Sequence, residues 1–237
     1  YFMAIRTKTK RTIKRVLIGL AAVFCLIEGY YIGQVLYYSK ADITTSAYIE
    51  SERERLGKVT VRPVPLSRVS NNMIRAVIAA EDVNFLDHNG IEWKALQTAF
   101  ISNVLEGEAA PGGSTITQQL VKNLFLSHKK SYIRKAQEIV LAKVMEATWS
   151  KGRILQTYLN VAEFGQGIFG VEAAARHYYG QRASTLNHWQ SLWLACILSN
   201  PRYYEKRGST RWLEIRMRRV SRAMTFPEVY RVNNRLK

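Results

Sequence analysis

The residues best suited to chemistry lie between Glu81 and Gly90. Glu81 follows a mostly apolar run, Met73 to Ala80, that we expect to be helical and to end there. A helix C-terminus carries partial negative charge, and apolar neighbours disfavour an ionised carboxyl, so both effects should raise the pKa of Glu81. A carboxyl with a raised pKa suits general-base catalysis near neutral pH.

The residues after Glu81 leave two interpretations open. If the helix continues, Phe85 and His88 follow Glu81 at i+4 and i+7 and share its face. Alternatively, Glu81 and Asp82 are only a solvated helix end. The acidic pair does not decide between these interpretations by itself, so the other motifs must be weighed with it.

A second polar motif follows a turn-rich break at residues 106–113. Ser114 to Gln119 opens a predicted helix, and Thr115 with Gln118 has the spacing of a capping box. An ordinary helix start explains this pattern. The functional interpretation is a seat for phosphate or sugar hydroxyls at the helix N-terminus, with Lys122 one turn after Gln118 on the same side.

Basic residues surround one carboxylate on the next predicted helix. Arg134 and Lys135 precede Glu138 by four and three residues, which a surface ion pair worth a few tenths of a kcal/mol explains. The functional interpretation is a cation cluster that neutralises a pyrophosphate. Its members would be Lys129, Lys130, Arg134, Lys135, Lys151 and Arg153.

Two other patterns predict no cofactor site. Residues 165–170 match G-x-G-x-x-G, but a helical pattern precedes them where a dinucleotide fingerprint requires a strand. We therefore expect a tight turn between helices there. Cys25 and Cys196 lie in separate apolar segments, and such a pair makes neither a disulfide framework nor a metal site.

The composition indicates an anionic partner. The chain has 237 residues, 35 Lys and Arg against 18 Asp and Glu, and a formal net charge of +17. This excess predicts binding to nucleic acid, phospholipid or a phosphorylated substrate. The basic residues gather at both ends: residues 6–15 have no acidic companion, and residues 202–237 hold eleven basic residues against three acidic ones.

Residues 16–38 decide between these partners. As a helix this apolar run would span roughly 34 Å, enough to cross a bilayer. The basic flank precedes the run, so the positive-inside rule places residues 1–15 in the cytoplasm and the chain after Lys40 outside. A cleaved signal peptide is the alternative, but the run is long for one and no small-x-small cleavage site follows.

The remaining chain predicts a mainly α domain. Residues 1–15 are the expected basic tail, 16–38 the membrane helix, 39–69 a loop-rich tether with a short extended piece at 58–61, and 70–237 the extramembrane domain. Strand patterns are nearly absent. Helical periodicity predicts helices near residues 71–81, 91–106, 115–126, 131–149, 151–161, 169–179, 188–198 and 211–224.

Together these segments resemble the peptidoglycan glycosyltransferases, which polymerise lipid II outside the bacterial plasma membrane. The resemblance covers about Ala76 to Met224 and depends on four ordered motifs, with the glycine turn after them as a fifth match. The motifs are E-D-x-x-F-x-x-H-x-G from Glu81, G-G-S-T-I-T-Q-Q from Gly112 with Lys122 and Asn123 after it, R-K-x-x-E from Arg134, and K-x-x-I-L-x-x-Y-L-N from Lys151.

The resemblance implies a lysozyme-like α fold with a catalytic lobe and a small membrane-facing jaw. It implies that Glu81 is the general base and that Glu138 organises the cations or a metal ion. Some family members use a divalent cation, Mg²⁺ or Mn²⁺, and the sequence does not reveal whether this chain does. The implied substrate-binding residues are Asp82, Phe85, His88, Ser114, Thr115, Thr117, Gln118, Gln119, Lys122, Asn123, Lys130, Arg134, Lys135, Lys151 and Asn160.

The resemblance also implies partners and location. The substrates would be lipid II and the growing glycan strand, the surroundings would be membrane lipids, and other wall-synthesis or division proteins are possible partners, whereas nucleic acid is not. The chain would be a single-pass protein of the bacterial plasma (inner) membrane with its catalytic domain outside. It ends at Lys237, too early for a transpeptidase domain, which predicts a monofunctional transglycosylase.

This chain departs from the family pattern at several positions. Thr98 and Lys130 stand where arginine is common, and a lysine keeps the charge but loses the bidentate fork. Gln156 and Gln190 replace glutamates. The last motif, R-x-x-x-V-L, survives only as Arg216 and Val220, which puts the packing of the C-terminal helix in question.

Two other functions remain as alternatives. A lysozyme-like enzyme that cleaves glycan would need one catalytic glutamate, but it would use neither a cation cluster nor a membrane anchor. A non-catalytic, membrane-anchored scaffold of wall synthesis would keep the basic surface and lose the chemistry. The cations favour pyrophosphate release, and with it the polymerase.

Overall fold

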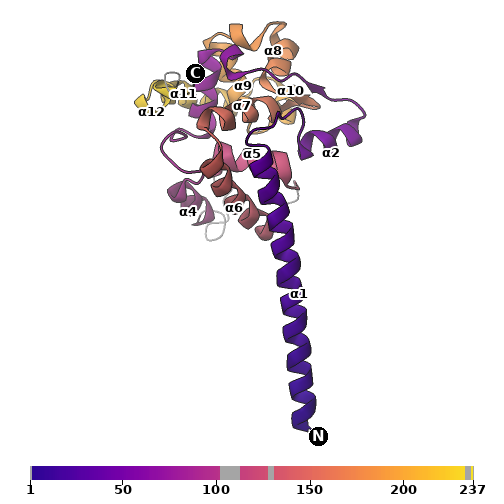
Figure 1. Ribbon diagram of the computed structural model, residues 1–237. Helices are drawn as coiled ribbons and strands as arrows, with labels where there is room; N and C mark the ends of the chain where they lie inside the picture. The colour runs from indigo at the N-terminus through magenta and orange to yellow at the C-terminus, as the bar shows by residue number, and fades with distance from the viewer. Residues whose placement is uncertain (1, 102–112, 128–130, 233–235, 237) are drawn as a thin grey trace. The chain divides into compact units, whose positions relative to one another are not determined.

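The computed structural model describes residues 2–101, 113–127, 131–232 and 236. The chain divides into two compact units, Tyr1–Ala41 and Asp42–Lys237. Figure 1 traces both along the chain.

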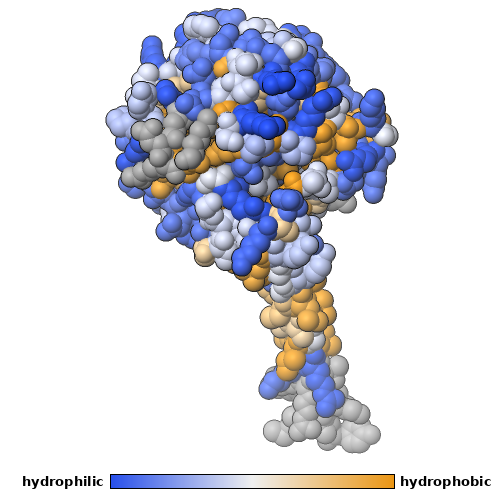
Figure 2. All heavy atoms as spheres, turned by 45° about the horizontal axis from the view of Figure 1, so that its top comes forward, coloured by the Kyte–Doolittle hydropathy of each residue, from blue (hydrophilic) through white to orange (hydrophobic). Residues whose placement is uncertain are grey.

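The first unit is one long helix, α1 (Phe2–Tyr37). Its segment Lys14–Tyr37 is long and apolar enough to cross a membrane, with a mean hydropathy of 1.9. Side chains along it, such as Leu17, Phe24 and Leu26, are exposed, and Figure 2 shows the apolar band that they form. An exposed apolar helix of this length suggests a membrane-anchored protein. Its orientation stays a prediction.

The second unit is built around α3 (Asn71–Glu81), which packs against α9 (His188–Ile197) and α11 (Arg211–Ala223). Ser70 caps α3 by accepting a hydrogen bond from the Met73 amide at 3.1 Å. Six apolar side chains of α3 are buried, among them Met73, Ile74 and Val77. Their burial fixes the helix, and therefore the position of Glu81 at its end.

A second layer surrounds α5 (Ile116–Phe125). This helix packs against α6 (Tyr132–Thr148), α7 (Lys151–Val161) and α2 (Ala47–Leu56). The predicted capping box is confirmed: Thr115 accepts from the Gln118 amide, and the Gln118 side chain accepts from the Thr115 amide. Leu120 and Val121 are fully buried, so α5 runs through the core of this layer.

A small sheet lies where the sequence analysis placed a tight turn between helices. Its strands are β1 (Thr60–Val61), β2 (Glu163–Gly165) and β3 (Ile168–Phe169), in the order β1-β3-β2. β1 runs parallel to β3, and β2 runs antiparallel to it. The predicted tight turn between helices is confirmed at Gln166 and Gly167, but this turn closes a β-hairpin, so the two flanking strands were missed. The extended piece at 58–61 is confirmed as β1.

Six further short elements complete the described part of the unit, and Figure 1 labels the helices among them. They are α4 (Trp93–Ile101), α8 (Val171–Tyr179), α10 (Pro201–Arg207), α12 (Pro227–Tyr230) and two 3-10 turns at Leu66–Arg68 and Ala183–Thr185. The mainly α fold is confirmed. Helices α2, α10 and α12 were not predicted, because only Ile49, Glu52 and Val229 of them are buried and their sequences therefore carry little apolar periodicity.

Helix α2 is fastened to the rest of the unit by charge. Arg202 donates to Glu52 and Glu163, both at 2.8 Å, and Tyr48 donates to Glu163 at 2.5 Å. Burial and the Glu163 carboxylate raise the pKa of Tyr48 far above its usual range, so the phenol keeps its proton and remains a donor. The segment before β1 is therefore part of the folded unit.

Replacing Gly170 by alanine should destabilise this unit by about 2–3 kcal/mol. Gly170 has a φ of +86°, and an added Cβ would lie 2.7 Å from the carbonyl oxygen of Asn160. Thermal unfolding measures the loss. The matched control is Gly180→Ala, because Gly180 has a φ of +67° with nothing within 4 Å of its Cβ, and should cost about 1 kcal/mol. Equal losses in the two variants would contradict the steric argument.

Candidate functional site

Glu81 is the last residue of α3 and lies mostly buried, with 12% of its side chain exposed. One carboxylate oxygen accepts from the Nη2 of Arg216 at 2.8 Å, and the other accepts from the Nε2 of Gln119 at 2.8 Å. Tyr158 donates to the Oε1 of Gln119 at 3.0 Å, which turns the amide NH₂ toward Glu81. The carboxylate is therefore held by two donors from distant parts of the chain.

Burial raises the pKa of Glu81, and this is the largest effect on it. Arg216 and Gln119 oppose the rise, because a positive charge and a donor both favour the ionised form. The direction agrees with the sequence prediction. The main physical cause is desolvation of the carboxyl by the surrounding side chains. Of the two predicted causes, the apolar neighbours correspond to this effect and the helix C-terminus does not.

Asp82 connects the end of α3 to the start of α5. Its Oδ2 accepts from the amide of Ile116 at 3.0 Å, and its Oδ1 lies 2.7 Å from the Nε2 of His88. The Nδ1 of His88 accepts from the Gly90 amide at 3.1 Å, so the proton of the neutral ring belongs on Nε2. Asp82 therefore fixes the end of α3 relative to the start of α5.

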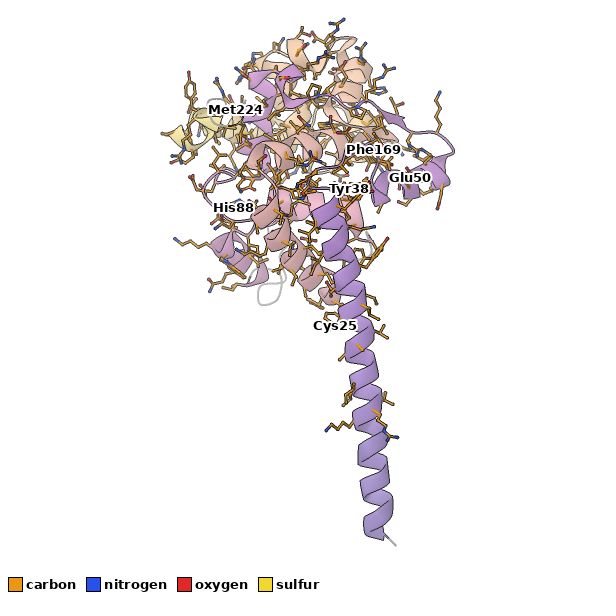
Figure 3. All side chains as sticks on the ribbon, viewed as in Figure 1. Cys25, Tyr38, Glu50, His88, Phe169 and Met224 are labelled. Atoms are coloured by element: carbon orange, nitrogen blue, oxygen red, sulfur yellow. The ribbon has the colours of Figure 1, made fainter. Side chains whose placement is uncertain are left out.

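The continued helix considered for Phe85 and His88 is not formed. α3 ends at Glu81, and residues 82–90 make turns. Phe85 is nevertheless fully buried, with its ring edge-on to His88 at a centroid distance of 6.4 Å. Figure 3 shows His88 in the connection between α3 and α4. The two residues support the backbone around Glu81 through packing and not through a shared helical face.

A pocket of about 670 Å³ opens beside Gln119. Helix α6 supplies one wall and α5 the other. Its lining residues are Ser114, Gln119, Lys122, Ser131, Tyr132, Arg134, Lys135 and Glu138. Gln119 also bonds to Glu81, so a ligand in the pocket would lie within one side chain of the buried carboxylate.

Three cations and one carboxylate set the charge of the pocket. Glu138 is buried and pairs with both Arg134, at 2.7 Å, and Lys135. Lys135 also donates to the hydroxyl of Ser114 at 2.9 Å. Burial lowers the pKa of Lys122, whereas the Glu138 carboxylate acts in the opposite direction. The predicted pairing of Glu138 with Arg134 and Lys135 is confirmed, and it joins a buried carboxylate to two partly exposed cations.

The structure does not bring Lys151 to this pocket. Its ammonium group donates to the backbone carbonyl of His88 and to Glu146, both at 2.8 Å, and lies over the Phe85 ring. Lys130 and the turn-rich residues 106–112 lie outside the described residues. Among the predicted cations that the structure describes, Lys122, Arg134 and Lys135 meet at the pocket.

Several predicted binding residues use their polar groups inside the protein. Thr115 donates to the carbonyl of Gly90 at 2.7 Å, and Thr117 donates to Glu146 at 2.5 Å. Gln118 is fully buried in the capping box, and Asn123 is buried in α5. Asn160 bonds to both backbone groups of Val64, at 3.0 and 2.9 Å. Lys122 lines the pocket together with Gln119, whereas Gln118 is fully buried and does not line it.

The roles of Arg216 and Glu146 were not predicted from the sequence. Arg216 was noted only as the remnant of a packing motif, although it pairs with Glu81 from 135 residues away. Glu146 is buried and joins Thr117 to Lys151. The arginine that begins the last family motif is the sequence signal that could have revealed the role of Arg216. Nothing in the spacing of Glu146 distinguishes it from a surface glutamate.

A bound metal does not fit this pocket. Among its described lining residues Glu138 is the one carboxylate, and both of its oxygens are paired with cations. In the part of the chain that the structure describes, no group of three or more His, Cys, Asp or Glu side chains could hold a metal ion.

Comparison with known proteins defines the class. A model of the transglycosylase family matches residues 50–225, and the chain belongs to this family, whose domain is lysozyme-like. It is 44% identical over 236 residues to the biosynthetic peptidoglycan transglycosylase of Bordetella avium, covering 94% of this chain and 98% of that one. The corresponding protein of Aromatoleum aromaticum is 45% identical over 91% of this chain and 96% of its own. That of Herminiimonas arsenicoxydans is 51% identical over 70% and 72%.

Removing the positive charge of Arg216 should raise the pKa of Glu81 further. Arg216 is the group that most strongly opposes the rise in the pKa of Glu81 that burial causes. The Arg216→Gln variant and the wild type can be compared by carboxyl ¹³C NMR titration. Arg219→Gln is the control, because Arg219 is exposed on the same helix. A Glu81 pKa that stays constant or falls in Arg216→Gln would contradict the pairing.

Proposed function

We propose that this protein polymerises lipid II into glycan strands, with inversion at the donor sugar and release of undecaprenyl pyrophosphate. One observation carries the proposal: a buried carboxylate, Glu81, is joined through Gln119 to a pocket that holds three cations. A base beside an anion-binding pocket is the arrangement that sugar transfer from a pyrophosphate requires. The family and its named relatives, which are glycosyltransferases of wall synthesis, support the same function.

In this mechanism Glu81 is the general base. It takes the proton of the acceptor's 4-hydroxyl as that oxygen forms a bond to the anomeric carbon of the donor. Because burial raises the pKa of Glu81, the carboxylate accepts a proton more readily than an exposed one. Arg216 favours the ionised form of the carboxyl, and Gln119 fixes its orientation.

The pocket receives the leaving group. The bond between the anomeric carbon and the pyrophosphate oxygen breaks, and the electron pair leaves with the pyrophosphate. Lys122, Arg134 and Lys135 stabilise that developing charge, because fixed cations in a poorly solvated site act more strongly than in water. Glu138 holds Arg134 and Lys135 in place and does not touch the reacting atoms.

The anchor places this reaction at the membrane. We propose that residues 1–15 are cytoplasmic, that α1 crosses the plasma membrane and that the unit from Asp42 onward works outside. A lipid-linked donor is confined to the bilayer, so an anchored enzyme meets it in two dimensions. Partners among other wall-synthesis or division proteins remain a prediction.

The glycan-cleaving alternative is less well supported. Hydrolysis or lytic cleavage of glycan releases no phosphate, so the three cations at the pocket would have no task in it. The scaffold alternative leaves unexplained why Glu81 is buried between two donors at a free-energy cost. Sugar transfer from a pyrophosphate uses both features.

The Glu81→Gln variant should lose at least about 10³-fold in kcat/KM for polymerisation of labelled lipid II. The amide keeps the size of the side chain but cannot accept the proton. In the wild type, activity should fall as the pH drops through the raised pKa of Glu81, because only the ionised carboxyl is a base. Undiminished polymer from a folded Glu81→Gln protein would refute the proposed base.

The Lys122→Met variant should lose about 10²-fold or more in kcat/KM, because it removes a desolvated cation from the pocket. Lys143→Met is the matched control, since Lys143 is exposed on α6 and does not line the pocket. Gel analysis of the polymer and of released undecaprenyl pyrophosphate measures both variants. Equal activity of the two would contradict a role for Lys122 at the leaving group.

A further inference from the structure

Tyr158 is a buried titratable residue to which the proposed reaction assigns no task. It is the tyrosine of the K-x-x-I-L-x-x-Y-L-N motif and lies on α7, which packs against α5. Its hydroxyl donates to the Oε1 of Gln119 at 3.0 Å, and within the described part of the chain this is its one hydrogen bond. The phenol is therefore committed to the residue that contacts the base, Glu81.

The surroundings of Tyr158 keep its hydroxyl protonated. Burial, and after it the charge of Glu81, raise the pKa of Tyr158 well above its usual range. A protonated phenol beside an amide oxygen acts as a hydrogen-bond donor. The carbonyl of Gln119 therefore points toward α7, and its NH₂ group points toward the Oε2 of Glu81 at 2.8 Å.

The opposite orientation of the Gln119 amide meets two unfavourable contacts. If the amide turned over, its carbonyl oxygen would face the Glu81 carboxylate, and two acceptors would oppose each other. Its NH₂ group would face the phenol, whose proton would then lack an acceptor in a buried place. Such unmade hydrogen bonds are costly. The second of these contacts exists only because residue 158 carries a hydroxyl, so Tyr158 itself favours the orientation in which Gln119 donates to Glu81.

The pocket offers the Gln119 carbonyl a competing partner. Gln119 lines the pocket together with Lys122 and Lys135. Ammonium groups donate to amide oxygens, so a Gln119 side chain without its phenol donor would turn its carbonyl toward these cations. The NH₂ group would then leave Glu81. The hydroxyl of Tyr158 holds the carbonyl on the α7 side and prevents this exchange.

We infer that Tyr158 is a positioning residue for the proposed reaction, because it holds Gln119 as a hydrogen-bond donor to Glu81. This inference rests on the proposed function, in which Glu81 is the base. Tyr158 acts through Gln119 and does not touch the reacting atoms. Its own place is fixed by α7, which Ser150 caps and whose side chains Ile154 and Leu155 are buried. A side chain locked by packing suits this supporting task.

The consequence for Glu81 follows from the groups around it. The charged or titratable ones are Arg216 on α11, Lys122 on α5, Asp82 after α3, Tyr158 on α7 and Cys196 on α9. Arg216 and Lys122 favour the ionised carboxyl, and Asp82 disfavours it. Burial raises the pKa of the Cys196 thiol to about 12, so the thiol stays neutral. The bond from Gln119 also favours the ionised form, so weakening it should raise the pKa of Glu81 further.

The Tyr158→Phe variant tests the inference, because phenylalanine keeps the ring and removes the hydroxyl. It should lower kcat with labelled lipid II about tenfold and change KM less than about twofold. The loss of activity at low pH should begin at a higher pH than in the wild type. Carboxyl ¹³C NMR of Glu81 should show the same upward shift without substrate. The control is Tyr178→Phe, which removes a hydroxyl that donates to the Phe164 carbonyl at 2.8 Å and should change neither measurement.

A double-mutant cycle separates positioning from a general structural role. Because Tyr158 acts through the amide, Tyr158→Phe should cost no further activity in a Gln119→Ala background. Thermal unfolding verifies that each variant is folded. Losses that multiply in the double variant would overturn the inference, as would a Tyr158→Phe protein with an unchanged Glu81 titration. A wild type that makes no polymer would overturn the proposed function, and the NMR comparison would still decide whether Tyr158 acts on Glu81.

Discussion

The structure depends on one carboxylate kept out of water between two donors. Glu81, at the end of α3, is held by Arg216 from α11 and by Gln119 from α5. The carboxylate therefore has this environment only when the three helices are packed together. Burial favours the protonated carboxyl, whereas pairing with a cation favours the ionised form and so makes a weaker base. The balance of the two raises the pKa of Glu81 while leaving Arg216 to stabilise the ionised form.

Helix α5 links this base to the cations. Asp82 holds the first turn of α5 through the Ile116 amide, and Tyr158 sets the rotamer of Gln119 from the other side. One turn further, Lys122 faces Glu138 and its two partners on α6. A displacement of α5 would therefore disturb proton transfer and anion binding together. The capping box at Thr115, which begins α5, is buried, and both of its hydrogen bonds are formed.

Helix α11 contributes to the site from its buried side. Arg216 reaches Glu81 from this helix, whose side chains Leu213 and Val220 are buried. The packing of α11 against α3 and α9 therefore positions the guanidinium that pairs with the carboxylate.

What the sequence determined by itself was local. Periodicity predicted α3, α5, α6, α7, α9 and α11 to within a few residues, the Thr115–Gln118 spacing predicted its capping box, and the spacing before Glu138 predicted its two cations. Each depends on contacts within one or two turns of a helix. Only the tertiary structure decided that Arg216 reaches Glu81, that Lys151 supports Phe85 and Glu146 away from the pocket, and that residues 163–169 form a hairpin. Those outcomes depend on which helix faces which, and helical spacing carries no record of distant partners.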